Sequence, residues 1–582
     1  MGLEYGIIGN CRSCALIKEG DIEWWCFPSF DSPSVFARLL DNEKGGTFAI
    51  EAEGCRVSHR YVPDTNILET TFSSDEAEFR VLDFFIRYRQ NGTIVKDDRI
   101  YRLVQPVRGE PRLSIVFDPR PDYARGQPVH TRHEKSITVD HPRQIVSLYS
   151  NVETDTFSGI RLEGDIFFVA SCADPFTGDV KDVRHAYELT KAYWEGYVKR
   201  GRFEGDFRKD AVRSALVLKL LTYEDTGAIV AAATTSLPEI RGGTRNWDYR
   251  YCWLRDSSFT ITALQRIGHV HEADRYMDFL KRVIFSCDIA KEACDSDLQV
   301  VYGIRGEKEL HEEILDHLAG FAGSRPVRIG NAAYTQRQID VAGEVIDAIH
   351  GYYCKASIPL DDGLWELVKH LADYVVERWG EKDQGIWEFR EIREHFTFSK
   401  LMSWVALDRA LRIAEHADRL PPGSWERERD AIRASILENA FDEKVGAFMI
   451  SYGSQYLDAS VLLMPVYGFI EGDDPRMRST VHAVETELAE GPLVMRYNMP
   501  DDFGQQENAF LICSFWLIDA LTLAGEEKRA REYLSRMFGY CNGLGLFSED
   551  LEIRTQQLVG NFPQAYTHIA ILNSIVRLDG GG

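Results

Sequence analysis

The hydrophobic pattern of this chain changes its period once, close to residue 184, and that change limits the folds that it can adopt. Before this point apolar residues tend to recur at every second position. In "EFRVLDFFIRYRQNG", for example, Leu82, Phe84, Ile86 and Tyr88 would share one face of a β-strand. After this point apolar residues recur at the spacing of an α-helix. The pattern therefore predicts a β domain followed by an α-helical domain.

Short strand-like runs repeat through the first 183 residues, without a helical pattern between them. They include "TFAIEAE", "PRLSIVFDP", "QIVSLYSNV" and "DIFFVAS". Many short strands separated by turn residues are typical of an antiparallel β-sandwich. We therefore predict a β-sandwich domain over residues 1–183 and a linker helix over residues 184–203, which contain "ELTKAYWEGYVKR".

The rest of the chain, residues 204–582, reads as one helix after another. Apolar stripes run through "FRKDAVRSALVLKLLTYED", "GLWELVKHLADYVVERWG", "FSKLMSWVALDRALRIAEHA", "WERERDAIRASILENAF" and "NAFLICSFWLIDALTLAG". The longest apolar run, "AFLICSFWLI", is much shorter than the roughly 20 residues that a membrane-spanning helix requires. This region is therefore predicted to be an all-helical domain.

The charge and the cysteines of the chain restrict its function and its location. The 582 residues include 91 acidic and 67 basic side chains, which give a formal net charge of -24. Such a charge repels nucleic acid and anionic membranes, so we expect neither as a partner.

The 11 cysteines are scattered, and the N-terminus lacks the pattern of a secretion signal. We predict a cytoplasmic protein, with homo-oligomerisation left open.

Five loops of the helical region concentrate tryptophan, tyrosine, arginine and carboxylate side chains. They are "GGTRNWDYRYCWLRDSS", "PVRIGNAAYTQRQID", "GIWEFREIREHF", "GPLVMRYNMPDDFG" and "GLFSEDLEIRTQQLVGNFPQAYTH". Aromatic rings cover the C–H faces of a sugar, and polar groups fix its hydroxyls. A single loop of this kind could equally use its aromatic side chains for packing, but five together favour a sugar-binding pocket.

Glycoside hydrolysis with inversion needs two carboxyl groups on opposite sides of the sugar, about 6.5 to 9.5 Å apart. Glu388, in "GIWEFR", and Glu391 are three residues apart, and if this segment is helical they lie on one face of it, so they cannot form such a pair. Glu549, in "LFSEDLE", follows the Gly-rich turn "NGLG" and precedes an aromatic loop. We therefore predict Glu549 as the partner of Glu388.

No metal site and no cofactor are predicted. Cys11 and Cys14 form a C-x-x-C pair, but no second pair follows at zinc-like spacing, which favours a buried structural role. His311 and His317 in "HEEILDH" lack the i, i+4 spacing of a helical metal pair, and we interpret this segment as a solvent-facing helix. The stretch "CDSDLQ" lacks the full pattern of a calcium loop.

The motifs, taken in order, resemble glycoside hydrolase family 15, which contains glucoamylases and glucoamylase-like trehalases. The resemblance extends over nearly the whole chain through "IGNCRSCALIKEGDIEWWCFPSFDSPSVFARLLD", "RNWDYRYCWLRDSS", "RIGNAAYTQRQID", "GIWEFR", "FSKLMSWVALDRA" and "VGNFPQAYTHIAI". The first of these resembles the opening of bacterial and archaeal members that carry a β-sandwich before the catalytic domain. The resemblance implies an (α/α)6 toroid, with twelve helices in two concentric rings and the active site where the loops meet.

The resemblance also implies roles for individual residues. Glu388 would be the general acid and Glu549 the general base of an inverting, exo-acting hydrolase that releases glucose from an α-glucoside. Substrate-binding roles are implied for Arg255, Asp256 and Arg496, and pocket-lining positions for Trp253, Asn331, Tyr334, Trp387 and Tyr497.

Phe389 departs from the family pattern, because fungal glucoamylases carry a second glutamate directly after the acid, where it helps to bind the neighbouring sugar. We therefore expect the leaving group to be recognised differently here. Trehalase action is predicted, because many relatives with this N-terminal opening and no secretion signal act on trehalose. The alternatives are glucoamylase action on maltooligosaccharides and, in a different class, a non-catalytic sugar-binding protein, which would be expected to lack one of the two carboxylates.

Overall fold

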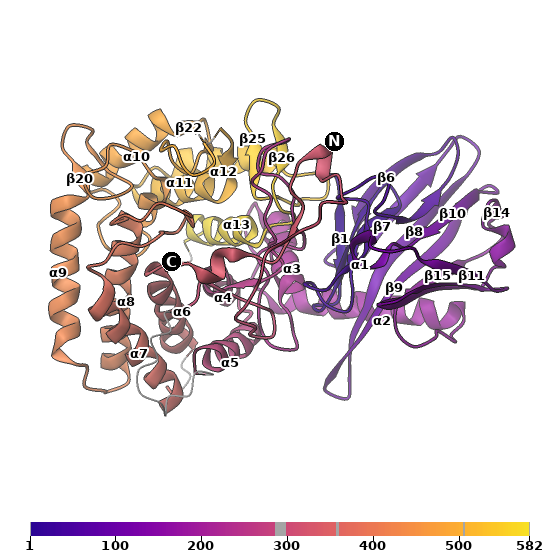
Figure 1. The fold of residues 1–582 in the computed structure, drawn as a ribbon, viewed down its shortest axis with the longest axis horizontal. Coiled ribbons are helices and arrows are strands. Elements are labelled where there is room, and N and C mark those ends of the chain that lie inside the picture. Colours follow the sequence, from indigo (N-terminus) through magenta and orange to yellow (C-terminus); the bar gives the residue numbers. More distant parts are fainter. Residues whose placement is uncertain (1, 286–297, 357–359, 505–506, 581–582) are drawn as a thin grey trace.

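The computed structural model describes residues 2–285, 298–356, 360–504 and 507–580. A sandwich of two antiparallel sheets, formed by the N-terminal part of the chain, lies beside a domain built of helices (Figure 1). The predicted fold class is therefore confirmed.

The first sheet of the sandwich has seven strands in the order β1-β2-β3-β5-β10-β14, and β4 pairs with β3 outside this path. All of its strand pairs are antiparallel. The predicted runs "TFAIEAE" and "PRLSIVFDP" form two neighbouring strands of this sheet. The strands are β1 (Gly6–Gly9), β2 (Cys14–Lys18), β3 (Asp21–Cys26), β4 (Ser34–Ala37), β5 (Thr47–Glu51), β10 (Arg112–Asp118) and β14 (Ile160–Arg161).

The second sheet has eight strands in the order β11-β12-β13-β15-β9-β8-β7-β6. One of its two long central strands, β8, contains the run in which the alternating pattern is clearest. The strands are β6 (Arg56–Tyr61), β7 (Leu68–Ser73), β8 (Glu78–Gln90), β9 (Thr93–Arg108), β11 (Val129–Arg132), β12 (Ser136–His141), β13 (Gln144–Ser150) and β15 (Ile166–Ser171).

Both faces of the second sheet are covered near β8. Phe79 and Val81 point into the core between the two sheets, while Leu82 and Phe84 belong to a separate apolar cluster on the outer face. Because successive side chains of a strand point to opposite faces, this division follows from the sequence register. The apolar side chains on the outer face are therefore buried by another element, which is a helix.

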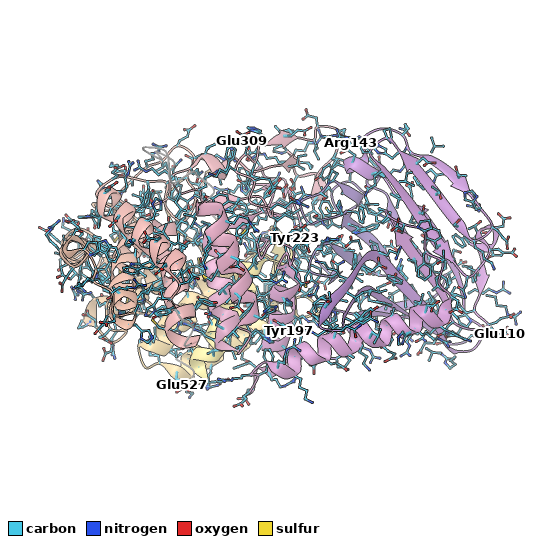
Figure 2. The ribbon with its side chains drawn as sticks, turned by 90° about the horizontal axis from the view of Figure 1, so that it is seen from below. Glu110, Arg143, Tyr197, Tyr223, Glu309 and Glu527 are labelled. Atoms are coloured by element: carbon cyan, nitrogen blue, oxygen red, sulfur yellow. The ribbon has the colours of Figure 1, made fainter. Side chains whose placement is uncertain are left out.

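That helix is α2 (Val180–Arg200), which packs on β8 and on β9. It begins at Val180 rather than at residue 184, because the Asp179 side chain caps the backbone N–H groups of Lys181 and Asp182. Figure 2 shows α2 lying along the sandwich, with Tyr197 near the end that faces the helical domain. The helix thus belongs to the packing of the sandwich, and the domain division at residues 183 and 203 stays a prediction.

The helical domain has two concentric rings. In the inner ring α4 packs on α6, α6 on α8, α8 on η4, η4 on α11, α11 on α13, and α13 again on α4. The inner elements are α4 (Leu254–Arg266), α6 (Asp340–Ala356), α8 (Thr397–His416), η4 (Ala459–Leu463), α11 (Leu511–Leu523) and α13 (Ala565–Leu578). The outer ones are α3 (Arg208–Leu221), α5 (His271–Phe285), α7 (Asp362–Arg378), α9 (Gly423–Asn439), α10 (Pro475–Glu487) and α12 (Glu527–Met537).

One inner position differs from the expected set of twelve α-helices. In the part of the chain that the structure describes, a short 3-10 helix, η4, occupies it. Asp458 caps the N-terminus of η4, and Pro465 follows soon after its end. Proline has no N–H to donate and disfavours helical geometry in the residue before it, which accounts for the early stop.

The remaining elements are short and lie mostly in loops. The segment "HEEILDH" contains strand β18 (Glu313–Ile314), which pairs with β19 (Arg328–Ile329). The helix predicted for this segment is therefore wrong, because strand pairing with a distant segment overrides the local sequence pattern. Residues 294–297 of "CDSDLQ" lie outside the described residues. The other short elements are α1 (Pro121–Ala124), β16 (Cys252–Trp253), β17 (Val301–Tyr302), β20 (Phe441–Asp442), β21 (Ala447–Phe448), β22 (Ala489–Glu490), β23 (Leu493–Val494), β24 (Ala509–Phe510), β25 (Asp550–Glu552), β26 (Gln557–Val559) and the 3-10 helices η1 (Thr154–Thr156), η2 (Phe321–Gly323), η3 (Ala332–Thr335) and η5 (Phe538–Tyr540).

The sandwich supports the long loop that leads from α3 to α4. The indole Nε1 of Trp24 donates a hydrogen bond of 2.9 Å to the carbonyl oxygen of Ala233. Buried Arg250 donates to the carbonyl oxygen of Ser32 at 3.0 Å and forms an ion pair with Asp248 at 2.6 Å. Two hydrogen bonds therefore join the loop to the sandwich, one from Trp24 to Ala233 and one from Arg250 to Ser32, and they fix the loop in place.

Candidate active site

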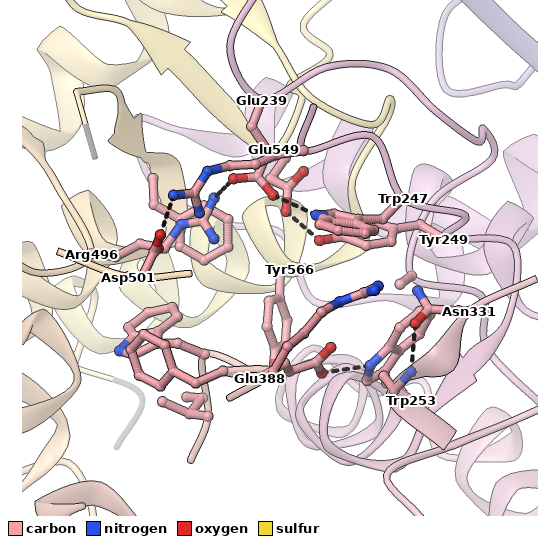
Figure 3. A pocket seen from close by; sticks show the side chains of 18 of the residues that line it. Glu239, Trp247, Tyr249, Trp253, Asn331, Glu388, Arg496, Asp501, Glu549 and Tyr566 are labelled. Atoms are coloured by element: carbon pink, nitrogen blue, oxygen red, sulfur yellow. Dashed lines mark hydrogen bonds and ion pairs between the residues drawn. The ribbon is translucent and has the colours of Figure 1, made fainter. Parts of the chain in front are cut away.

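The five loops singled out from the sequence meet at one pocket. Each of them leads from an outer helix to the next inner helix, so all five open at the same end of the toroid. The space that they enclose is about 880 Å³, including the solvent at its mouth. Figure 3 shows Glu388 on one side of this pocket and Glu549, with Tyr249 and Glu239, on the other.

Glu388 lies in the loop between α7 and α8 and has an unusual backbone conformation. Its φ of 59° falls in the left-handed region, which a residue with a side chain rarely adopts and which often marks a functional position. Its Oε1 accepts hydrogen bonds from Trp253 Nε1 at 2.7 Å and from Arg255 Nη2 at 3.0 Å. Among the described residues its Oε2 has no partner, so this oxygen is free to carry a proton towards a ligand.

Glu549 lies just before β25 and is 1 % exposed. Its Oε1 accepts a hydrogen bond of 2.7 Å from the hydroxyl of Tyr249, and its buried Oε2 has no partner among the described residues. Burial raises the pKa of the Glu549 carboxyl well above its usual value, and the charges of Glu239 and Asp550 raise it further. Glu549 is thus a strong base once it has lost its proton.

Arg496 is a cation that partly balances the negative charge of Glu239, Glu549 and Asp550. Its guanidinium forms ion pairs with Glu239 and with Asp550, the latter at 3.1 Å, and lies 4.4 Å from the centre of the Phe510 ring. Burial raises the pKa of Asp550 to about 7. Three carboxyl groups therefore surround one guanidinium, and the surplus of negative charge favours retention of a proton in this cluster.

Arg255 and Asp256 form the first turn of α4, which points its N-terminus at the pocket. Arg255 is held from three further sides: by Gln338 at 2.8 Å, by Asp340 at 3.7 Å and by the hydroxyl of Tyr566. Burial raises the pKa of Asp256 to about 7. This pair can therefore present fixed hydrogen-bonding groups at the floor of the pocket.

Trp387 and Tyr497 form an aromatic wall of the pocket. Their ring centres are 6.0 Å apart, Trp387 Nε1 donates to Asp458 at 3.0 Å, and the Tyr497 hydroxyl donates to Asp501 at 2.5 Å. Both polar ends are thus satisfied within the protein, and the rings are held in place to contact a ligand.

The remaining two predicted lining residues are placed differently. Asn331 lines the pocket, but its side chain is used locally, because it caps η3 at the N–H of Ala333 and donates to the carbonyl oxygen of Asp248. Tyr334 is not among the residues that line the pocket, and its hydroxyl contacts His311 at 3.1 Å. We therefore no longer assign a ligand contact to Tyr334.

Sequence reasoning missed three residues that shape the site. Tyr249 and Tyr566 lie inside loops that had been identified, but one tyrosine among many in such loops carries no signal of its own. Glu239 lies in "SLPEIRGG", outside those loops, and its only local signal is its place before a Gly-Gly turn. Its position beside Glu549 depends on contacts between residues that are far apart in the sequence.

Within the described part of the chain, no three or more His, Cys, Asp and Glu side chains are grouped so that they could hold a metal ion. Cys11 and Cys14 are buried free thiols, as a structural role requires. None of the described helices is long and apolar enough to cross a membrane.

Comparison with protein families identifies the fold. The model described as "Glycosyl hydrolases family 15" matches residues 205–529, and the one described as "Trehalase-like, N-terminal" matches residues 4–155. The chain belongs to glycosyl hydrolase family 15. It is thus a glycoside hydrolase, as predicted. The family 15 match ends before Glu549, so the assignment of this residue depends on its position in the pocket.

Relatives of this family 15 enzyme are similar over its full length. The protein named "Trehalase" from Mycolicibacterium smegmatis is 36% identical, over 99% of this chain and 91% of the relative. That from Thermoplasma volcanium is 33% identical, over 99% of this chain and 93% of the relative. A bacterial glucoamylase solved in complex with acarbose superimposes with a TM-score of 0.73 at 15% identity, over 100% of this chain and 94% of the other, which shows a shared fold.

Proposed function

We propose that this enzyme hydrolyses α,α-trehalose to two glucose molecules, with inversion at the attacked carbon. The observation that carries the proposal is that Glu388 and Glu549 line one pocket from different loops, and each keeps one carboxyl oxygen without a protein partner among the described residues. Two separated carboxyl groups are what an inverting glycosidase needs.

In this proposal Glu388 is the general acid and Glu549 the general base. Trp253 and Arg255 both donate to Oε1 of Glu388, which leaves Oε2 to hold the proton. That proton moves to the glycosidic oxygen as the bond from this oxygen to the anomeric carbon breaks. A water molecule attacks the anomeric carbon from the other side and gives its proton to the Glu549 carboxylate.

The attacked glucose would bind at the floor of the pocket. Arg255, Asp256 and Arg496 would contact its hydroxyls, and the rings of Trp253, Trp387 and Tyr497 would cover its apolar faces. Trehalose is proposed as the substrate because the relatives above carry the name trehalase over the whole length of this chain. We further propose that the enzyme acts in the cytoplasm, without a cofactor.

Variants of the two glutamates test these roles. Glu388→Gln cannot donate a proton and should reduce kcat on trehalose by several orders of magnitude, with an unchanged Tm. Glu549→Ala should be similarly slow, and azide should restore turnover, because a small nucleophile can enter the space of the missing carboxylate and attack without a base. Near-normal activity of Glu388→Gln would refute its role as the general acid.

A panel of substrates tests the choice of trehalose. Purified wild-type protein would be assayed on trehalose, maltose, isomaltose and longer maltooligosaccharides. Cleavage of maltose but not of trehalose would refute trehalose as the substrate.

A further inference from the structure

Both residues that follow the acid line the pocket, but the first is buried in an apolar cluster and only the second is substantially exposed. Phe389 is 3% exposed, and its ring stacks on Phe396 with centres 5.3 Å apart. The side chain of Arg390 is 35% exposed and lines the pocket. Arg390, two residues after Glu388, is therefore the exposed side chain that a ligand at the pocket mouth would meet.

The Arg390 side chain is held in place before any ligand binds. Its backbone N–H donates to Oδ2 of Asp502 at 2.6 Å, and its guanidinium lies 4.4 Å from the centre of the Trp247 ring. Its Nη2 donates to Glu312 at 2.7 Å. Trp247 in turn donates from Nε1 to Glu239 at 3.1 Å, so the ring that orients Arg390 is itself fixed.

Several groups at this place are unused by the protein. Among the described residues, Glu312 is the one hydrogen-bond acceptor of the Arg390 guanidinium, which leaves Nε and Nη1 as donors. Oδ1 of Asp502 has no partner in the same part of the chain. Phe503 is 38% exposed, and the centre of its ring lies 5.4 Å from the centre of the Trp247 ring. Donors, an acceptor and an apolar ring side by side match the needs of a pyranose.

The position of these groups fits the leaving group of the reaction. A general acid must lie within hydrogen-bond reach of the oxygen that departs, so the leaving sugar lies next to Glu388. The floor of the pocket is taken by Arg255 and Asp256, which leaves the mouth for that sugar. We propose that Arg390, together with Asp502 and Phe503, binds the leaving glucose unit and that Arg390 determines specificity for a disaccharide. This inference rests on the proposed function.

Two substrates with different leaving groups test the inference. Trehalose has a glucose leaving group, whereas the leaving group of α-D-glucosyl fluoride is a fluoride ion, which has neither the hydroxyls nor the ring of a sugar. For Arg390→Ala we expect kcat/KM on trehalose to fall about 10- to 100-fold, since charged hydrogen bonds are lost, while kcat/KM on the fluoride changes by less than about threefold. Arg390→Lys should lie between. Arg427→Ala, which removes an exposed arginine paired with Glu428 on α9, should match the wild type on both substrates.

The relative loss of activity on the two substrates distinguishes binding of the leaving group from support of Glu388. An equal loss on both substrates, in a variant with the wild-type Tm, would mean that Arg390 only supports Glu388, and the inference would be wrong. If wild-type protein cleaved the fluoride but not trehalose, the proposed function would fail instead. The ratio of maltose to fluoride activity would then test Arg390 in the same way.

Discussion

At the scale of single residues, the charge around Glu549 is the feature with the clearest consequence. A general base must be ionised, and the raised pKa of Glu549 places its ionisation above the pH range of an ordinary glutamate. The activity on trehalose should therefore fall on the acid side at an unusually high pH. Glu239 contributes to this, because its negative charge is the second largest cause of the raised pKa.

Glu239→Gln should move that acid limb to lower pH. The substitution removes a like charge beside Glu549 and also frees Arg496 to stabilise the Glu549 carboxylate, and both changes lower the pKa of Glu549. A shift of the limb of about one pH unit, measured as kcat/KM against pH, is the expected result. Glu527→Gln, on the exposed side of α12, serves as the control. A limb that stays where the wild type has it would show that Glu239 does not set the charge of the base.

The sequence predicted the loops of the site better than the contacts within them. Glu388, Glu549 and Arg255 were identified because they fall in recognisable motifs, and all three line the pocket. Glu239 and Tyr249 could not be identified in the same way, because what matters is their distance from Glu549, which the packing of separate helices determines. Tyr334 shows the converse, since a residue inside a motif need not line the pocket.

At the scale of elements, α6 carries buried acids whose effect on stability depends on pH. Glu344 is 1% exposed, and neither of its oxygens has a hydrogen-bond partner among the described residues. Burial raises its pKa well above the usual value, and the charge of Asp340 adds to this. A carboxyl with a raised pKa stabilises the fold fully below its unfolded pKa, and this contribution is lost as the pH rises through the folded pKa.

Glu344→Gln should therefore stabilise the protein at high pH only. The amide stays neutral, so at pH 9 the variant should gain about 1 to 3 kcal/mol over the wild type, whereas at pH 5 the two should be similar. Thermal unfolding at both pH values measures this, with Glu366→Gln on the exposed face of α7 as the control. The same stability difference at pH 5 and pH 9 would rule out the titration of Glu344 as its cause.

The elements also show where the sequence pattern had its limits. Long amphipathic runs such as α7 and α8 were predicted, because their periodicity extends over several turns. The short inner element η4 and the β18–β19 hairpin were not, because their conformations depend on a proline after the helix and on pairing across a loop. Local pattern is informative in proportion to the length of the element.

At the scale of the whole molecule, the sandwich and the toroid together make the site. The loop that carries Tyr249 and Trp253 is fixed on the sandwich through Trp24 and Arg250. This loop contacts both carboxyl groups, because Tyr249 donates to Glu549 and Trp253 donates to Glu388. Both glutamates themselves lie in loops of the toroid, so the toroid determines the distance between them and with it the stereochemistry of the reaction, while the sandwich supports the loop that orients them.

The anomeric form of the products tests the central claim most directly. Trehalose joins two α-linked glucose units, so inversion at one of them yields one β-glucose and one α-glucose. Proton NMR, recorded before mutarotation, should show the two anomers in equal amounts at the start of the reaction. If the first product were α-glucose alone, the reaction would proceed with retention, and the roles of Glu388 and Glu549 as acid and base of an inverting hydrolase would be wrong.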